Sequence, residues 1–248
     1  MRLAGRRILV TGAASGIGAA TVRRFLAEGA CIAALDIDGT GLEALRAAGG
    51  EALLSLQCDV SHYEEVDAAL RKAAGQFGGL DGIVNCAAID DVRPIAQSNA
   101  DHWRRIFEIN VTAPMMLCRL ALELFTGPAS IVNVSSAAGL KPLPNRTAYC
   151  ASKAALIMAT KALAMEITGK EVRANVVCPG VIDTPMLRAS FETAVDPDAA
   201  YRQILGRNIL SRIARPEEVA HGILYLTSDE ASFVTGSTLT VDGGRVFH

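Results

Sequence analysis

The sequence predicts an α/β fold of the Rossmann type, in which a doubly wound, seven-stranded parallel sheet is flanked by helices within a single domain. Short apolar runs alternate with longer amphipathic stretches along the chain, as strands alternate with helices in such folds. Runs such as Ile8–Val10 and Ile131–Val134 are apolar enough to be buried on both faces, as parallel strands covered by helices are. Right-handed crossovers then join the strands, and ligands bind beyond their carboxyl ends.

Each expected element follows from this alternation. The apolar runs predict strands at Arg7–Val10, Cys31–Leu35, Ala52–Leu56, Gly82–Asn85, Ser130–Val134, Arg173–Val177 and Thr238–Val241. The amphipathic stretches predict helices at Gly16–Glu28, Gly41–Ala48, Tyr63–Phe77, Ala100–Phe125, Ala148–Thr168 and Glu217–Thr227. The long insertion from Pro185 to Pro216 (residues 185–216) has no strands of its own, and we expect it to form a lid over the substrate.

The composition narrows the class of protein. Of the 248 residues, 50% are hydrophobic and 20% are charged, which excludes disordered, collagenous and coiled-coil proteins. The formal net charge is −2, with no block of like charges, so neither nucleic acid nor an anionic membrane is an expected partner. The length allows one large domain or two small ones, but no repeat or low-complexity linker divides the chain. We therefore expect a single domain over residues 1–248.

The cysteines and histidines do not predict a metal site. The six cysteines never occur as Cys-x-x-Cys or near a histidine at ligand spacing, and the four histidines share no ligand spacing. In a chain of this length such cysteines indicate reduced, buried thiols and a cytoplasmic protein.

A glycine-rich segment, Thr11-Gly12-Ala13-Ala14-Ser15-Gly16-Ile17-Gly18, follows the first expected strand. Glycines let the backbone turn sharply and approach a pyrophosphate, which rests on the N–H groups that open the next helix. An ordinary strand–helix turn is the alternative, because the spacing is Gly-x-x-x-Gly-x-Gly. No Gly-Lys-Ser/Thr follows, which excludes a P-loop. We expect the cofactor's phosphates to contact Gly12, Ser15, Gly16, Ile17 and Gly18.

Asp36 follows the second expected strand, about twenty residues after the glycines. A carboxylate there accepts hydrogen bonds from an adenosine ribose and repels the 2′-phosphate of NADP. No arginine or lysine lies in the glycine loop or directly after Asp36, where Ile37 follows. The expected cofactor is therefore NAD. Two further strand ends are expected to meet its adenine and ribose, although each alone is more often just a loop: Asp59-Val60 and Asn85-Cys86-Ala87-Ala88.

Tyr149 and Lys153 lie four residues apart on an expected helix, hence on one face. A phenol with a pKa near 10 is a poor acid–base group at neutral pH, and an ammonium beside it lowers that pKa. Taken alone, such a pair is usually a surface feature. Ser135-Ser136 ends the fifth expected strand, and Asn110 lies within the helix after the fourth, where a lone asparagine is usually just exposed.

Taken together, these motifs resemble one family, the short-chain dehydrogenases/reductases. The resemblance runs from about Leu3 to Gly244. The residues that carry it are the Thr11-Gly12…Gly16-x-Gly18 loop, Asp59-Val60, Asn110, Ser136 with Tyr149-x-x-x-Lys153, Pro179-Gly180 and Val241-Asp242-Gly243-Gly244. Several motifs in this order are far more specific than any one of them.

The resemblance implies a role for each of four residues. Tyr149 would be the acid/base, and Ser136, the second serine of its pair, would hold the substrate oxygen. Lys153 would bind the nicotinamide ribose and lower the pKa of Tyr149. Asn110 would keep a water in a proton relay behind the lysine.

The resemblance also assigns the loop after the sixth strand to the cofactor. Beyond Pro179, Val181 would contact the carboxamide through its backbone, and Thr184 would lie near the phosphates. The chain departs from the family in one motif, where Asn-Asn-Ala-Gly is usual and Asn85-Cys86-Ala87-Ala88 stands here. Cys86 cannot make the hydrogen bonds of an amide, and Ala88 adds a methyl group beside the cofactor. We therefore expect this departure to affect cofactor affinity more than the chemical step.

The expected activity is hydride transfer between a secondary alcohol or ketone and NAD(H). Arg146, just before Tyr149, and Arg188, in the insertion, could hold a hydroxy or keto acid, since guanidinium groups bind carboxylates bidentately. Both could instead be solvated. An expected apolar wall of four residues would suit a neutral cyclic alcohol, polyol or sugar equally well: Leu140, Leu143, Met186 and Leu187. Two other hypotheses are a non-catalytic NAD-binding sensor and a sugar-nucleotide epimerase. The epimerase would need a larger C-terminal domain.

We also expect a homotetramer. The helices Ala100–Phe125 and Ala148–Thr168 carry more apolar residues than one side of a sheet can cover, and resemblance to the family implies that they pair across two-fold axes. Burial of both stripes within the monomer is the alternative. The residues concerned include Met115, Leu117, Leu120, Leu156, Met158 and Leu163.

Overall fold

The computed structural model describes residues 1–167, 169, 171–192, 196–206 and 208–247. The end of the predicted helix Ala148–Thr168, residues 193–195 and 207 of the predicted lid, and His248 lie outside the described residues.

A seven-stranded sheet forms the centre of the molecule, and every strand pairs in parallel with its neighbours. In space the strands run in the order β3-β2-β1-β4-β5-β6-β7, so the direction of winding reverses between β1 and β4. This reversal is where ligands bind in doubly wound sheets. The predicted fold class is confirmed. The strands are β1 Arg7–Thr11, β2 Cys31–Asp36, β3 Leu53–Gln57, β4 Leu80–Asn85, β5 Phe125–Val134, β6 Val172–Pro179 and β7 Thr238–Val241.

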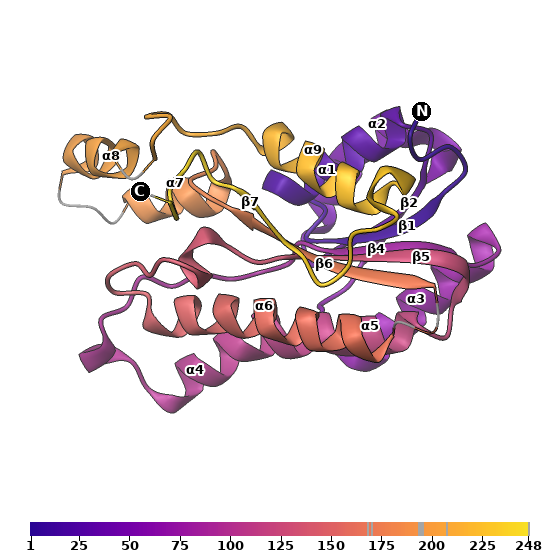
Figure 1. Cartoon of the computed structure of the whole chain (residues 1–248), viewed down its shortest axis with the longest axis horizontal. Helices are drawn as coiled ribbons and strands as arrows, with labels where there is room; N and C mark the ends of the chain where they lie inside the picture. Colours follow the sequence, from indigo (N-terminus) through magenta and orange to yellow (C-terminus); the bar gives the residue numbers. More distant parts are fainter. Residues whose placement is uncertain (168, 170, 193–195, 207, 248) are drawn as a thin grey trace.

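Helices cover both faces of this sheet (Figure 1). One layer contains α1 and α9, with α2 beside them; the other contains α3, α5 and α6, with α4 extending from the end of α5. The described helices are α1 Gly16–Ala27, α2 Gly39–Gly49, α3 Tyr63–Phe77, α4 Ala100–Phe107, α5 Ala113–Ala121, α6 Thr147–Glu166, α7 Pro185–Glu192, α8 Pro197–Leu205 and α9 Pro216–Thr227.

The core is divided by the sheet into two clusters. Ile8 and Val10 on β1 pack into the cluster beneath α1 and α9, whereas Leu9 between them packs into the cluster on the other face. All three side chains are fully buried. Side chains alternate along a strand, so β1 contributes to both clusters, and this accounts for its continuous apolar run.

The predicted single helix Ala100–Phe125 is wrong. It is α4, a π-helical turn at Glu108–Thr112 and α5, which ends at Ala121. Strand β5 then begins at Phe125 rather than at the predicted Ser130. The Leu80 N–H donates to the Leu124 carbonyl and Leu80 pairs with Phe125, so pairing with β4 draws this apolar segment into the sheet. The other predicted boundaries agree with the described elements to within two residues.

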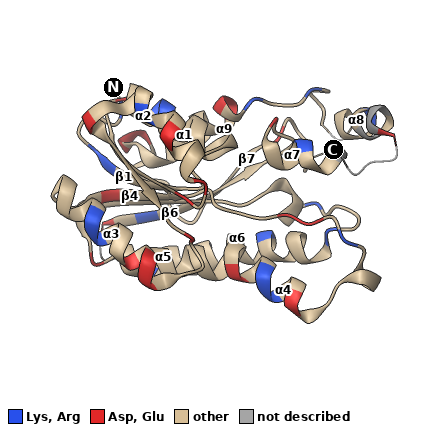
Figure 2. Ribbon diagram, turned by 180° about the vertical axis from the view of Figure 1, so that it is seen from behind, with Lys and Arg blue, Asp and Glu red and all other residues tan. Residues whose placement is uncertain are grey.

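The predicted lid forms α7 and α8 over its described residues, beyond the carboxyl end of the sheet and near the C-terminus (Figure 1). Figure 2 shows basic and acidic residues interspersed on helices such as α3 and α4. Among the described helices, none is both long and apolar enough to cross a membrane.

Candidate active site

The glycine loop between β1 and α1 closes one side of a cavity of about 310 Å³. Gly12 has a φ of 63°, and a Cβ on it would lie 2.7 Å from the Ala87 nitrogen. A Cβ on Gly18 would lie 1.9 Å from the Gly12 carbonyl oxygen. Only glycine fits at either position. Helix α1 begins at Gly16, and the Ser15 side chain at its N-cap does not cap it. The helix N-terminus is therefore open to a phosphate.

Asp36 lies at the end of β2 in the wall of the same cavity. Its Oδ2 accepts a hydrogen bond from the Ala14 backbone N–H and its Oδ1 one from the Asp38 N–H, each at 2.9 Å. The carboxylate is thereby fixed at the edge of the glycine loop, with its negative charge toward the cavity.

Most of the predicted cofactor residues line this first cavity. Pro179 and Val181 instead line a second cavity, and Asn85 lines neither. The Asn85 amide is buried and donates to Asn133 Oδ1 at 2.7 Å, so it links β4 to β5. The residues of the prediction that line the first cavity are Gly12, Ser15, Gly16, Ile17, Gly18, Asp36, Ile37, Asp59, Val60, Ala87, Tyr149, Lys153 and Thr184.

The loop that departs from the family motif is held at its backbone. The Ala87 N–H donates to Thr11 Oγ1 at 3.2 Å, which joins the ends of β4 and β1. Cys86 packs against the apolar core beside the glycine loop, and Ala88 lies in the wall of the first cavity.

Asn110 lies in the π-helical turn and is fully buried. Its Oδ1 accepts from the Ile89 N–H and its Nδ2 donates to the Ile89 carbonyl, both at 2.9 Å. Nδ2 also lies 3.1 Å from Ser152 Oγ, which donates to the Tyr149 carbonyl. The wide turn thus places one amide between the loop after β4 and helix α6. The predicted water relay stays a prediction.

Lys153 is buried against the end of β5. Its Nζ donates to the Val134 carbonyl at 3.1 Å and lies 5.8 Å from the centre of the Tyr149 ring. The next residue, Ser135, donates from Oγ to the Lys153 carbonyl at 2.7 Å. Burial lowers the pKa of Lys153 to about 8, so the amine loses its proton and its positive charge at mildly alkaline pH.

The pKa of Tyr149 moves in the direction opposite to the expected one. Burial and then the negative charge of Asp90 raise it to about 12, and a hydrogen bond with Ser136 and the positive charge of Arg146 oppose the rise. Lys153 is close to the ring but its own charge is weakened by burial. Desolvation of the phenolate therefore outweighs the neighbouring cations.

The two cavities meet at Tyr149. The second, of about 130 Å³, adds Ser136 and shares five residues with the first: Ile17, Ser135, Tyr149, Thr184 and Met186. The Ser136 Oγ accepts from the Ala138 N–H at 3.0 Å, which fixes it as the N-cap of a short turn. The structure therefore brings Ser136, Tyr149 and Lys153 together, with Asn110 behind them. Of the predicted apolar wall, Leu143, Met186 and Leu187 line the second cavity and Leu140 does not.

The two predicted substrate arginines are placed differently. Arg146 lines the second cavity and forms an ion pair with Asp90, at 3.3 Å between Nη1 and Oδ2. Arg188 lines neither cavity. It forms two hydrogen bonds with Asp183, at 2.9 and 3.0 Å, and its side chain is 68% exposed.

Two charged residues of the second cavity were not anticipated, Asp90 and Arg245. Asp90 follows β4 at the carboxyl edge of the sheet, and its position five residues after Asn85 was a usable signal. Arg245 lies in the tail after β7, and nothing in the local sequence indicates that the tail folds back to donate to the Lys141 carbonyl.

The chain is similar to known proteins over nearly its whole length. Residues 12–245 match the family model described as enoyl-(acyl carrier protein) reductase. A 3beta-hydroxysteroid dehydrogenase of Eggerthella lenta is 38% identical over 99% of this chain and 95% of its own length. A 2,5-dichloro-2,5-cyclohexadiene-1,4-diol dehydrogenase of Sphingobium indicum is 38% identical over 98% and 97%, respectively.

A solved structure has the same fold. The crystal structure of a short-chain dehydrogenase/reductase from Brucella melitensis, a glucose/ribitol dehydrogenase by its title, superposes with a TM-score of 0.92 at 32% identity, covering 98% of each chain. The chain therefore belongs to the short-chain dehydrogenase/reductase family, oxidoreductases that act on hydroxyl and keto groups with a nicotinamide cofactor.

Proposed function

We propose that this protein is an NAD(H)-dependent dehydrogenase that moves a hydride between a secondary alcohol or ketone and nicotinamide, with Tyr149 as acid/base. The observation that carries the proposal is the meeting of the two cavities at Tyr149. A dinucleotide in the first cavity and an alcohol in the second would have their reacting ends on either side of one phenol.

Each residue of the site would either orient the substrate and cofactor or transfer the proton of the alcohol. The Ser136 hydroxyl would hold the substrate oxygen, and the Tyr149 phenol would exchange the proton with it. Lys153 and the Val134 carbonyl that fixes it would hold the nicotinamide ribose, and Asn110 would fix the loop and helix between which the site opens. Bound NAD supplies the hydride acceptor. Asp36 supports NAD over NADP, since both of its oxygens are fixed at the cavity wall.

A neutral alcohol is the better-supported substrate, and a hydroxy or keto acid the weaker alternative. Both arginines proposed for an acid already face a carboxylate, Arg146 that of Asp90 and Arg188 that of Asp183. The relatives named as hydroxysteroid and diol dehydrogenases also support an alcohol. The six free cysteines support a cytoplasmic location.

The proposal is tested by following NADH absorbance with NAD and a panel of neutral cyclic alcohols, polyols and hydroxy acids. We expect turnover with alcohols, and Tyr149→Phe to reduce kcat by about a hundredfold or more, since it removes the proton-transferring hydroxyl. Cofactor binding should survive in this variant and is measured by NADH fluorescence. An enzyme that binds NADH tightly but turns over no alcohol would instead be a sensor that has kept the fold.

A further inference from the structure

Arg146 lies in the wall of the second cavity, and the proposed hydride transfer gives it no role. It is the N-cap residue of α6 and lies three residues before Tyr149. Its positive charge opposes the rise that burial and Asp90 cause in the pKa of Tyr149. The side chain of Arg146 is only 16% exposed. Charged groups are seldom buried to this extent unless their bonding capacity is used.

The hydrogen-bond donors of Arg146 are free. Its Nη1 lies 3.3 Å from Asp90 Oδ2, which makes an ion pair but not a hydrogen bond. No hydrogen bond joins its guanidinium group to any described residue, and none of its nitrogens is buried. A guanidinium group has five N–H donors in a fixed fork. Those of Arg146 are therefore open at the cavity wall, where a bound molecule can reach them.

The rest of the second cavity contains little that could bond to Arg146 in place of a substrate. Arg245 is 5% exposed and already donates from Nη2 to the Lys141 carbonyl at 2.8 Å. Much of the remaining wall is apolar, and includes Leu143, Ile182, Met186, Leu187 and Ile204. A substrate that displaces water from this cavity must therefore supply an acceptor to Arg146 or leave its N–H groups unpaired.

The charges around Arg146 favour a neutral acceptor. Asp90 lies against Arg146 and offsets its charge, and the negative charge of Asp242 likewise acts on Arg245. A substrate carboxylate on Arg146 would lie beside the carboxylate of Asp90, which repels it. A carbonyl oxygen has two lone pairs and only a partial negative charge, so it can accept from the guanidinium group with much less repulsion.

We propose that Arg146 donates a hydrogen bond to a neutral carbonyl oxygen of the substrate, so that the preferred substrates are alcohols that carry a carbonyl group besides the carbinol oxidised at Tyr149 and Ser136. A site built to hydrogen-bond a substrate group rejects analogues that lack it, because its own polar group is then left unpaired. This inference rests on the proposed alcohol dehydrogenase activity and narrows its substrate class.

The test compares each positional isomer of hydroxycyclohexanone with the methylenecyclohexanol of the same ring position. The two members of a pair have nearly the same shape, and only the ketone has a second acceptor oxygen. The measured quantity is the ratio of their kcat/KM values with NAD. For at least one isomer we expect this ratio to be about tenfold or more higher in the wild type than in Arg146→Ala, because the variant loses a hydrogen bond from a charged group. Comparing one ratio between two proteins cancels the intrinsic reactivity of the probes and any effect of the substitution on Tyr149.

A matched control is available next to the site. Arg93 pairs with Asp91 at 2.7 Å, as Arg146 pairs with Asp90, but neither Arg93 nor Asp91 lines either cavity. Arg93→Ala should keep the ratio of the wild type for every isomer. If Arg146→Ala fails to fold because it leaves Asp90 buried and unpaired, the double variant Asp90→Ala/Arg146→Ala removes both charges and should show the same loss.

The outcomes separate this inference from the proposed function. Oxidation of cyclohexanol, with every ratio unchanged in Arg146→Ala or in the double variant, would overturn the role of Arg146 and leave the dehydrogenase activity standing. If hydroxycyclohexanecarboxylates exceed the hydroxyketones in the wild type and lose that advantage in Arg146→Ala, the acceptor is a carboxylate and the neutral assignment is overturned. Failure of the wild type to oxidise any alcohol would remove the proposed function and this inference with it.

Discussion

At the residue scale, Asp36 fixes the glycine loop, and the proposed preference for NAD depends on it. Its two oxygens accept from the Ala14 and Asp38 amides, so the carboxylate cannot turn away from a 2′-phosphate. We expect kcat/KM to favour NAD over NADP by about 2 kcal/mol or more, roughly thirtyfold. Asp36→Ala should reduce this preference and weaken binding of both cofactors, because the Ala14 amide loses its acceptor. Equal use of NAD and NADP by the wild type would contradict the prediction.

A second prediction concerns the pH dependence of alcohol oxidation. Burial and then Asp90 raise the pKa of Tyr149 to about 12, and the phenolate is the form that accepts the alcohol proton. Asp90→Asn removes the negative charge, so the phenolate becomes easier to form and its pKa falls. The alkaline rise of kcat for cyclohexanol should therefore move to lower pH. The profile of Asp91→Asn should coincide with that of the wild type, and an unshifted or upward-shifted profile in Asp90→Asn would count against the assignment.

The sequence could predict which residues gather at the site but not their interactions. Tyr149 and Lys153 were singled out by helical spacing and Asp36 by its place at a strand end, and resemblance to the family selected Ser136. The direction of the pKa of Tyr149 does not, because it depends on burial, which local sequence does not encode. The side chain of Asn85 likewise turns toward Asn133, a contact set by how β4 and β5 pair.

At the element scale, Arg7 joins the start of β1 to β4. Its backbone N–H and its Nε each donate to Asp81 Oδ2 at 2.8 Å, and Nη2 donates to Oδ1. Burial opposes ionisation of Asp81, but these bonds outweigh it and lower its pKa. We expect Arg7→Leu to reduce the free energy of unfolding by about 2 kcal/mol, measured by urea denaturation.

The ion pair of Arg7 and Asp81 stabilises the protein less as the pH falls. The pKa of Asp81 is lower in the folded protein than in the unfolded chain. The stabilisation of the folded state by this ion pair is therefore complete above the unfolded-state pKa, and it is lost as the pH falls through the folded-state pKa. The loss caused by Arg7→Leu should therefore shrink on acidification. The exposed pair of Arg71 and Asp67 on α3 provides the control, and Arg71→Leu should have a much smaller effect. Equal effects of the two substitutions would argue against the β1–β4 pair.

The boundaries of an element were predictable where its apolar residues keep the spacing of a helix or of a strand throughout. They were not predictable over 100–125, because no glycine, proline or cluster of turn residues separates the end of α5 at Ala121 from the start of β5 at Phe125. Gly127-Pro128 comes only after β5 has begun. Nor does a π-helical turn have a sequence pattern of its own, and Asn110 gave no indication that its amide would meet both Ile89 and Ser152.

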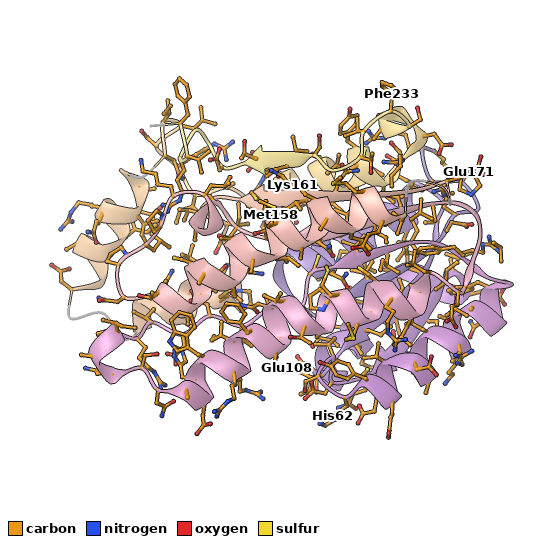
Figure 3. All side chains as sticks on the ribbon, turned by 60° about the horizontal axis from the view of Figure 1, so that its bottom comes forward. His62, Glu108, Met158, Lys161, Glu171 and Phe233 are labelled. Carbon is orange, nitrogen blue, oxygen red and sulfur yellow. The ribbon has the colours of Figure 1, made fainter. Side chains whose placement is uncertain are left out.

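At the scale of the whole molecule, the sheet accounts for most of the apolar residues that suggested assembly. Leu117 and Leu156 are buried, and Met115, Leu120 and Leu163 pack against the core. Met158, by contrast, is 64% exposed and lies with Lys161 on the outer face of α6 (Figure 3). The homotetramer thus stays a prediction that rests on the family and on this one face.

Light scattering tests the assembly directly. We expect a particle of four chains at micromolar concentration, and a smaller particle for Met158→Glu, because a buried charge at a helix interface is costly. Arg23→Glu, an exposed charge change on α1 in the other helical layer, should leave the mass unchanged. A wild-type particle with the mass of one chain would show that the monomer is the native form.

The π-helical turn at Glu108–Thr112 holds one residue more than the α-helical turn it replaces. Deleting one residue of this turn other than Asn110 would turn it into a regular helix, but it would rotate α4 against α5 by about 100°. Asn110 could then no longer reach Ile89 and Ser152 together. Selection for heat resistance alone would favour this deletion, whereas selection for turnover would eliminate it.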